Sequence, residues 1–139
     1  KMGGRKVELD YLLKNSDFIS LHVPLTNETR HLIGERELSL MKKTAYLINT
    51  SRGAVINEIV LAKALREKQI AGAALDVYEK EPELTEGLSE MKNVVLTPHL
   101  GSATREARDK MSIMMAENCI AALRGEKPSN LVNPKVLKE

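Results

Sequence analysis

The sequence predicts an α/β domain in which a mostly parallel β-sheet is covered by helices. Short, nearly continuous apolar runs of strand length alternate along the chain with longer segments whose apolar residues recur at helical spacing. Continuous apolar runs, as opposed to strict alternation, are typical of strands that are covered on both faces. Strands that alternate with helices in this way form βαβ units, so the predicted fold class is a doubly wound parallel sheet.

Four segments are predicted to be strands, each rich in apolar residues and each of strand length. They are Asp17–Val23, Thr44–Asn49, Ile70–Val77 and Asn93–Pro98. The first stops at Pro24, and a Thr-Ser-Arg-Gly turn follows the second.

Four helices are predicted around these strands. Three of them span Leu9–Lys14, Glu35–Met41 and Glu58–Lys68, and the last of these has a broad apolar face. A longer helix is predicted to begin after the N-cap residue Thr104 and to close at Arg124, with Gly and Pro residues just beyond.

Composition excludes several classes of protein. The chain has 139 residues, a formal net charge of +2, 3% aromatic residues and no tryptophan, so it offers neither a basic stripe nor a stacking surface for nucleic acid. A single cysteine, Cys119, excludes an internal disulfide framework. No apolar run approaches the roughly 18 residues that span a bilayer, and the N-terminus lacks the apolar core of a signal peptide. We therefore expect a cytoplasmic protein with no nucleic-acid or membrane partner.

One expected feature of the fold is missing from the sequence. A doubly wound nucleotide-binding fold has two βαβαβ halves and carries its phosphate loop after the first strand. No GxGxxG follows a strand here, and Gly3-Gly4 is a poor phosphate loop because no strand precedes it. The chain is therefore predicted to be the second half of such a fold together with its exit helix.

Polar residues that follow the strands are the candidate functional site, because ligands bind at the carboxyl ends of the strands in open parallel sheets. Arg52 follows the second strand, Glu81 the third and His99 the fourth. Each has a simpler interpretation: a surface arginine, a solvated acid, and a histidine that caps the next helix. His22 and His31 are expected to be structural or solvated.

Taken together, these three residue types describe a specific chemistry. The planar guanidinium of Arg52 suits a substrate carboxylate, and His99 can exchange a proton with an adjacent oxygen. Glu81 would bond the far side of the imidazole, fix its tautomer and stabilise its protonated form. A positioned acid that donates to a carbonyl oxygen is what hydride reduction of a 2-keto acid requires.

Two other kinds of site are disfavoured by spacing. A serine nucleophile would use Ser51 or Ser102 with His99, but neither serine lies in a GxSxG elbow. The three histidines show no HxxxH or HxH spacing, so no metal site is expected.

Five motifs resemble the D-isomer-specific 2-hydroxyacid dehydrogenase family when taken in this order and spacing. They are HVPLT, INTSRGAVINE, AGAALDVYEKEP, NVVLTPHLGSAT and the closing RGEKPSNLVNP. The similarity runs from about residue 9 to residue 136 and is greatest to the glyoxylate and hydroxypyruvate reductase branch. It implies a Rossmann-like domain, NAD or NADP as cofactor, a small 2-keto or 2-hydroxy acid as substrate, and a homodimer.

The resemblance also assigns residues. It implies that Arg52, Glu81 and His99 are catalytic, with Arg52 and His99 on the substrate; a glutamate at position 81 argues against the formate dehydrogenase branch. The implied cofactor contacts are Val23, Pro24, Thr50, Ser51, Arg52, Asp76, His99, Leu100 and Gly101. Asp76 would bind the nicotinamide carboxamide, and the alternative for this residue is a cap at the end of its strand.

Parts of the family pattern are not in the sequence. The glycine-rich loop, the residue that chooses NAD or NADP, and the substrate domain are missing. Residues 1–124 would therefore be a partial NAD(P)-binding domain, and residues 125–139 a tail that returns to the substrate domain. We expect this fragment alone to be inactive and its first strand to have an open edge, with no regular strand at Lys6–Leu9. The alternative from another functional class is an NAD-sensing corepressor on the same fold.

Overall fold

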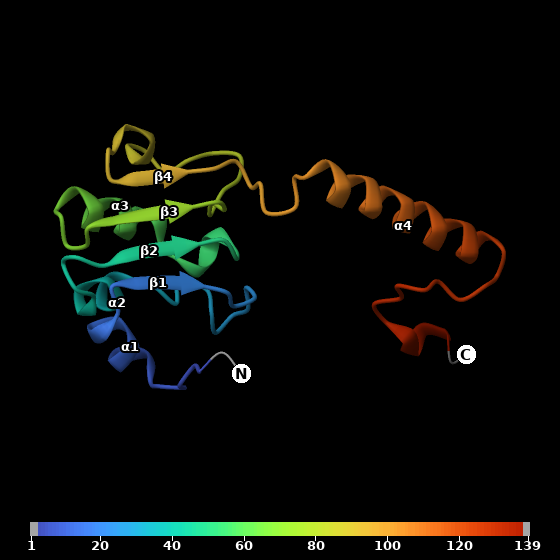
Figure 1. Ribbon diagram of the computed structural model, residues 1–139, viewed down its shortest axis with the longest axis horizontal. Coiled ribbons are helices and arrows are strands. Elements are labelled where there is room, and N and C mark those ends of the chain that lie inside the picture. Colours follow the sequence, from blue (N-terminus) through green and yellow to red (C-terminus); the bar gives the residue numbers. More distant parts are fainter. Residues whose placement is uncertain (1–2, 138–139) are drawn as a thin grey trace. The chain divides into compact units, whose positions relative to one another are not determined.

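A computed structural model describes residues 3–137, which form two compact units that divide between Gly101 and Ser102. The first unit contains a sheet of four parallel strands in the order β1-β2-β3-β4 (Figure 1). The strands are β1 Phe18–Leu21, β2 Tyr46–Asn49, β3 Gly72–Leu75 and β4 Val94–Leu96. Each lies within a predicted segment, so the parallel α/β class and all four strands are confirmed.

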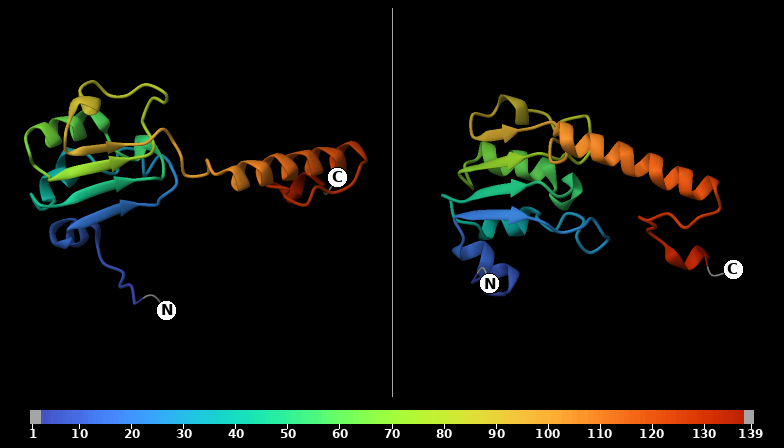
Figure 2. Two further views of the ribbon diagram at one scale, coloured as in Figure 1. Left: turned by 45° about the horizontal axis from the view of Figure 1, so that its top comes forward. Right: turned by 45° about the vertical axis from the view of Figure 1, so that its right-hand side comes forward.

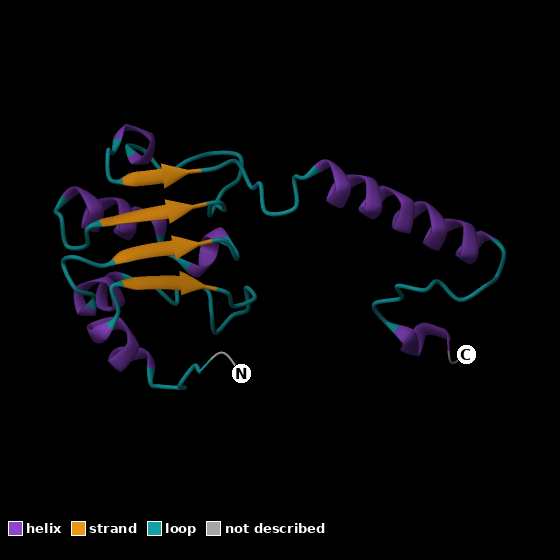
Figure 3. Ribbon diagram, viewed as in Figure 1, coloured by secondary structure: helices purple, strands orange, loops and turns teal. Residues whose placement is uncertain are grey.

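The register of the strands aligns their carboxyl ends. Leu21 pairs with Asn49, Asn49 with Leu75, and Leu75 with Leu96. The loops that follow the strands therefore start from one edge of the sheet, on the right in Figure 3. This is the edge at which the sequence predicts the functional residues.

The helices of the first unit are α1 Leu9–Asn15, α2 Glu35–Leu40 and α3 Glu58–Arg66, all within a residue or two of the predicted bounds. α3 begins where the Asn57 side chain accepts the Val60 N–H at 3.2 Å. Its apolar side chains join those of the strands in one buried core, whose central members include Leu47, Leu61 and Leu65. Two short 3₁₀ turns, Gly53–Val55 and Leu88–Glu90, complete this unit. Figure 2 shows the helices against the sheet in two further orientations.

The edge at β1 is open, as the sequence predicts. Within residues 3–137, β1 has only β2 as a strand neighbour, and residues 3–8 form neither helix nor strand before α1 begins at Leu9. The ring of Phe18 is 73% exposed and stacks on Tyr46, with ring centroids 5.6 Å apart. Unpaired strand edges beside exposed aromatic rings favour association.

The second unit contains the helix α4 Arg105–Leu123 and a final 3₁₀ turn, Pro134–Leu137. The Thr104 hydroxyl accepts the Ala107 N–H at 3.1 Å, which confirms the predicted N-cap. The tail returns to this helix through the side chain of Asn118, which bonds Asn130 twice at 3.2 Å. None of the helices described between residues 3 and 137 is long and apolar enough to cross a bilayer. The assignment of residues 1–124 and 125–139 to separate domains of a longer protein stays a prediction.

We predict that the isolated chain self-associates through the β1 edge. Light scattering after size-exclusion chromatography should show dimers or larger species. Phe18→Lys should shift the distribution toward monomer, because a charged side chain replaces the exposed aromatic ring at this edge. Lys substitution of Val132, which is also exposed but lies in the second unit, is the control and should leave the distribution unchanged. A monomeric unsubstituted chain at high concentration would contradict the prediction.

Candidate active site

His99 and Glu81, which are 18 positions apart in the sequence, meet at the carboxyl edge of the sheet. The imidazole Nδ1 lies 2.9 Å from Oε2 of Glu81 and 3.2 Å from Oε1. Because an ionised carboxylate only accepts hydrogen bonds, Nδ1 carries the proton and donates it. The contact thus leaves Nε2 on the opposite side of the ring. Both side chains are partly exposed, at 50% for His99 and 38% for Glu81.

Glu81 is held in its ionised form. The hydrogen bond from His99 lowers the pKa of its carboxyl, and the Tyr78 backbone N–H, which donates to Oε1 at 3.1 Å, lowers it further. The positive charge of Arg52 adds to the same effect. The structure thus brings His99 and Glu81 into direct contact, while the side-chain hydrogen bond of Arg52 is to its own turn.

The side chain of Asp76 accepts hydrogen bonds from the backbone of the turn that carries His99. The backbone of His99 has φ of 53°, in the left-handed region, and its N–H donates to the Thr97 carbonyl at 3.0 Å. Oδ1 of Asp76 accepts the Leu100 N–H at 2.8 Å, and Oδ2 accepts the Gly101 N–H at 3.0 Å. The side chain of Asp76 therefore caps this turn, and its contact with the nicotinamide carboxamide stays a prediction.

The charge of Asp76 is stabilised by its donors. The Thr97 hydroxyl, at 2.5 Å from Oδ1, is the main cause of a lowered pKa for the Asp76 carboxyl, followed by the Leu100 N–H. Thr97 was not singled out from the sequence. Its position directly after an apolar strand and before Pro98-His99 is the signal that could have indicated it.

The turn that carries Arg52 is organised by the buried side chain of Asn49. Its Nδ2 donates to the Arg52 carbonyl at 2.9 Å, while its Oδ1 accepts the Ser51 N–H at 3.0 Å. The Ser51 hydroxyl also donates to Oδ1, at 2.9 Å, and so is engaged as a structural group and not with His99. Arg52 itself is exposed, and its Nη1 donates to the Ser51 carbonyl at 2.6 Å.

The loop after β2 and the loop after β3 touch through their backbones at Gly53. A Cβ atom built on Gly53 would lie 1.9 Å from the Tyr78 carbonyl carbon and 2.4 Å from the Glu79 nitrogen. Only a glycine allows this approach, which brings the residue after Arg52 against the segment before Glu81. The Tyr78 hydroxyl then donates to the Thr97 carbonyl at 2.7 Å, which links this segment to the turn of His99.

The other two histidines form separate contacts. His22 lies 2.8 Å from the Ser20 hydroxyl, and Nε2 of His31 lies 2.8 Å from Oε1 of Glu79. Among the residues described, no three His, Cys, Asp or Glu side chains gather in a way that could hold a metal ion.

The remaining residues predicted for the cofactor also lie at this edge of the sheet. Val23 and Pro24 follow β1, Thr50 and Ser51 follow β2, and Leu100 and Gly101 follow β4. Because the strands are parallel and in register, the segments that contain these residues share one side of the domain.

The amino-acid sequence of the chain matches a known family. The protein-family sequence model described as "D-isomer specific 2-hydroxyacid dehydrogenase, NAD binding domain" matches residues 1–101. The chain belongs to this family. The matched range coincides with the first compact unit, which holds Arg52, Glu81 and His99.

Individual 2-hydroxyacid dehydrogenases are similar over almost the whole chain. A glyoxylate reductase of Thermococcus litoralis is 60% identical over 137 residues, which are 99% of this chain and 41% of that relative. The chain therefore spans less than half the length of this curated relative.

Solved structures of the family share the fold. The TT0316 protein of Thermus thermophilus has a TM-score of 0.85 at 44% identity, with 91% of this chain and 41% of that chain covered. An NADPH-dependent glyoxylate/hydroxypyruvate reductase of Sinorhizobium meliloti, solved with NADP and malonate, has a TM-score of 0.77 at 36% identity, with 81% and 35% covered.

We predict that Asp76→Asn destabilises this family member in a pH-dependent way. The pKa of Asp76 is lowered in the folded protein, so its stabilising effect is complete above the ordinary value of 3.8 and is lost as the pH falls through the lower folded value. At pH 7 the variant should lose about 1.5–3 kcal/mol of unfolding free energy, since an amide donor replaces a charged acceptor.

Urea unfolding at a series of pH values from 7 to 3 measures this effect. The exposed Asp109→Asn variant is the control and should match the wild type throughout. A stability loss for Asp76→Asn that stays constant down to pH 3 would contradict the assigned role of the carboxylate.

We also predict that Gly53→Ala is strongly destabilising, by about 3 kcal/mol, because the new methyl group collides with the Tyr78 backbone. Gly4→Ala is the matched control, since a Cβ there has no atom within 4 Å. Equal unfolding midpoints for the two variants in urea would show that the close approach at Gly53 does not exist.

Proposed function

We propose that this chain is part of a reductase that transfers a hydride between NADH or NADPH and a small 2-keto acid. The proposed substrates are glyoxylate and hydroxypyruvate, which would give the D-2-hydroxy acids. The observation that carries the proposal is the contact between Nδ1 of His99 and Glu81, which leaves Nε2 on the opposite side of the ring to face a substrate oxygen. The glyoxylate reductases among the relatives support the choice of substrate.

In this mechanism each of the three side chains has one role. Arg52 binds the carboxylate of the 2-keto acid through its planar pair of N–H donors. His99 donates the proton on Nε2 to the carbonyl oxygen as that oxygen becomes a hydroxyl. Glu81 accepts the hydrogen bond from Nδ1, which fixes the orientation of the ring.

The residues present fit the nicotinamide end of the cofactor. When bound, the nicotinamide supplies the hydride. Oδ2 of Asp76 accepts one N–H, from Gly101, and a carboxylate oxygen can accept two, so it has capacity for a carboxamide donor. Val23, Pro24, Thr50, Ser51 and Leu100 would line the same site. The choice between NAD and NADP is left open, and a homodimer in the cytoplasm is part of the same proposal.

We predict that His99→Ala lowers kcat for reduction of glyoxylate or hydroxypyruvate by about 10²–10⁴-fold, because a positioned proton donor is lost. Oxidation of NADH and of NADPH is followed separately, in the complete protein that contains this chain. His22→Ala is the control and should retain wild-type kcat. Fast turnover by His99→Ala, or none by the wild type with either acid, would refute the proposed function.

A further inference from the structure

We propose that Glu58 is a positioning residue that holds the Glu81–His99 pair in place by fastening both ends of the segment 79–85. Glu58 was not singled out from the sequence as part of the site, and it is distant along the chain from both Glu81 and His99. The inference rests on the proposed function, because it concerns the same proton-donating pair.

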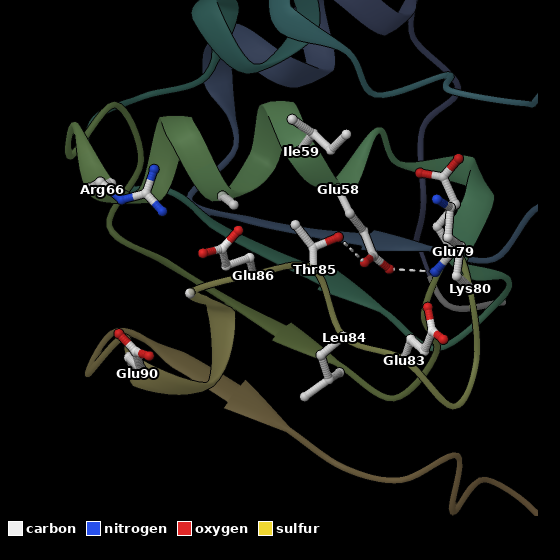
Figure 4. A pocket seen from close by; sticks show the side chains of 12 residues that line it. Glu58, Ile59, Arg66, Glu79, Lys80, Glu83, Leu84, Thr85, Glu86 and Glu90 are labelled. Atoms are coloured by element: carbon white, nitrogen blue, oxygen red, sulfur yellow. Dashed lines mark hydrogen bonds between the residues drawn. The ribbon is translucent and has the colours of Figure 1, made fainter.

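The carboxylate of Glu58 bonds the segment at two points. Oε1 accepts the backbone N–H of Glu79 at 2.5 Å, and Oε2 accepts the hydroxyl of Thr85 at 2.8 Å (Figure 4). These two residues begin and end a stretch of the loop after β3, and Glu81 lies between them. One side chain therefore closes the stretch that carries the partner of His99.

The side chain of Glu58 is fixed in place by its position in the fold. It is the first residue of α3 and only 2% exposed, and an acidic side chain is favoured at the N-terminus of a helix. The helix is fixed to the core by the buried side chains of Leu61 and Leu65. Both carboxyl oxygens of Glu58 are engaged in hydrogen bonds to the segment, so the helix holds it at two points.

The side chain of Glu81 is held by hydrogen bonds within and next to the segment, so its placement depends on where the segment lies. The Tyr78 N–H, immediately before Glu79, donates to Oε1 of Glu81 at 3.1 Å, and the Glu83 N–H donates to the Lys80 carbonyl at 2.9 Å. The segment thus has a tight internal turn whose two ends are attached to Glu58. If that attachment is lost, the turn can move as a unit and carry Glu81 away from the imidazole.

Packing on this side of the segment does not replace these bonds. A cavity of about 910 Å³ lies between α3 and the stretch 79–90, with Glu58 in its wall together with Ile59, Leu84 and Glu86 (Figure 4). Side chains that line an open space make few contacts across it. The carboxylate of Glu58 is therefore a principal link between the helix and the segment.

The test compares kinetics in the complete protein that contains this chain, with NADH or NADPH and hydroxypyruvate. Glu58→Ala should lower kcat about tenfold with less than about a twofold change in KM, because the proton donor is misplaced while Arg52 still binds substrate. Glu58→Gln keeps an oxygen for the Glu79 N–H and should retain most of kcat. Glu86→Gln, a neutralised acid in the same cavity wall, is the control and should match the wild type.

A double-mutant cycle separates positioning from general stability. In a Glu81→Gln background, Glu58→Ala should change kcat by less than about twofold, since its effect passes through Glu81. A full tenfold loss in that background would overturn the proposal, as would wild-type kcat in Glu58→Ala. If Glu58→Ala does not fold, Thr85→Val, which releases one end of the segment, takes its place with a smaller expected loss.

A spectroscopic measurement distinguishes failure of this inference from failure of the proposed function. The ¹⁵N and ¹H resonances of the His99 ring report the hydrogen bond from Nδ1 to Glu81 whether or not the protein turns over. Loss of that signature in Glu58→Ala but not in Glu86→Gln supports the positioning role even in an inactive protein. An unchanged signature in Glu58→Ala refutes it, even when the wild type is fully active.

Discussion

The close contact between Gly53 and the Tyr78 backbone is the constraint on which the rest of the site depends. It lets the loop after β2 lie directly against the loop after β3, so that the residue following Arg52 touches the segment that leads to Glu81. The hydroxyl of Tyr78 then joins this pair of loops to the turn of His99. Three loops that are separate in sequence are thereby joined by backbone contact and hydrogen bonds, in addition to buried apolar residues such as Val55 and Val77.

Much of this arrangement follows from the sequence by simple physical rules. The apolar runs locate the strands, and the parallel order places the ends of β2, β3 and β4 at one edge. The expected coverage on both faces was wrong for this chain, because burial alternates along β1 and leaves Phe18 exposed. Arg52, Glu81 and His99 were identified because each follows a strand. The bounds of the strands were predicted too long, as at Ile70–Val77, since apolar residues such as Val77 continue into buried loops beyond the last ladder bond.

The supporting residues could not be predicted in the same way. Asn49, Gly53 and Glu58 act through contacts with segments that are distant along the chain, and no local period or composition marks such contacts. Asp76 shows the same limit, because a strand-end acid that caps a turn and one that binds a ligand have the same sequence signal. The structure shows that Asp76 accepts the N–H groups of Leu100 and Gly101, a contact that its position in the sequence did not specify.

The partial exposure of the His99 side chain weakens the electrostatic interactions at this edge of the sheet. With half of the His99 side chain exposed to water, its interaction with the Glu81 carboxylate passes through a medium of high effective dielectric constant. Any part of a larger protein that covers this edge and expels water would strengthen all of these interactions at once. The interaction energy between His99 and Glu81 therefore depends on whether other parts of a protein cover this edge, as well as on the two side chains themselves.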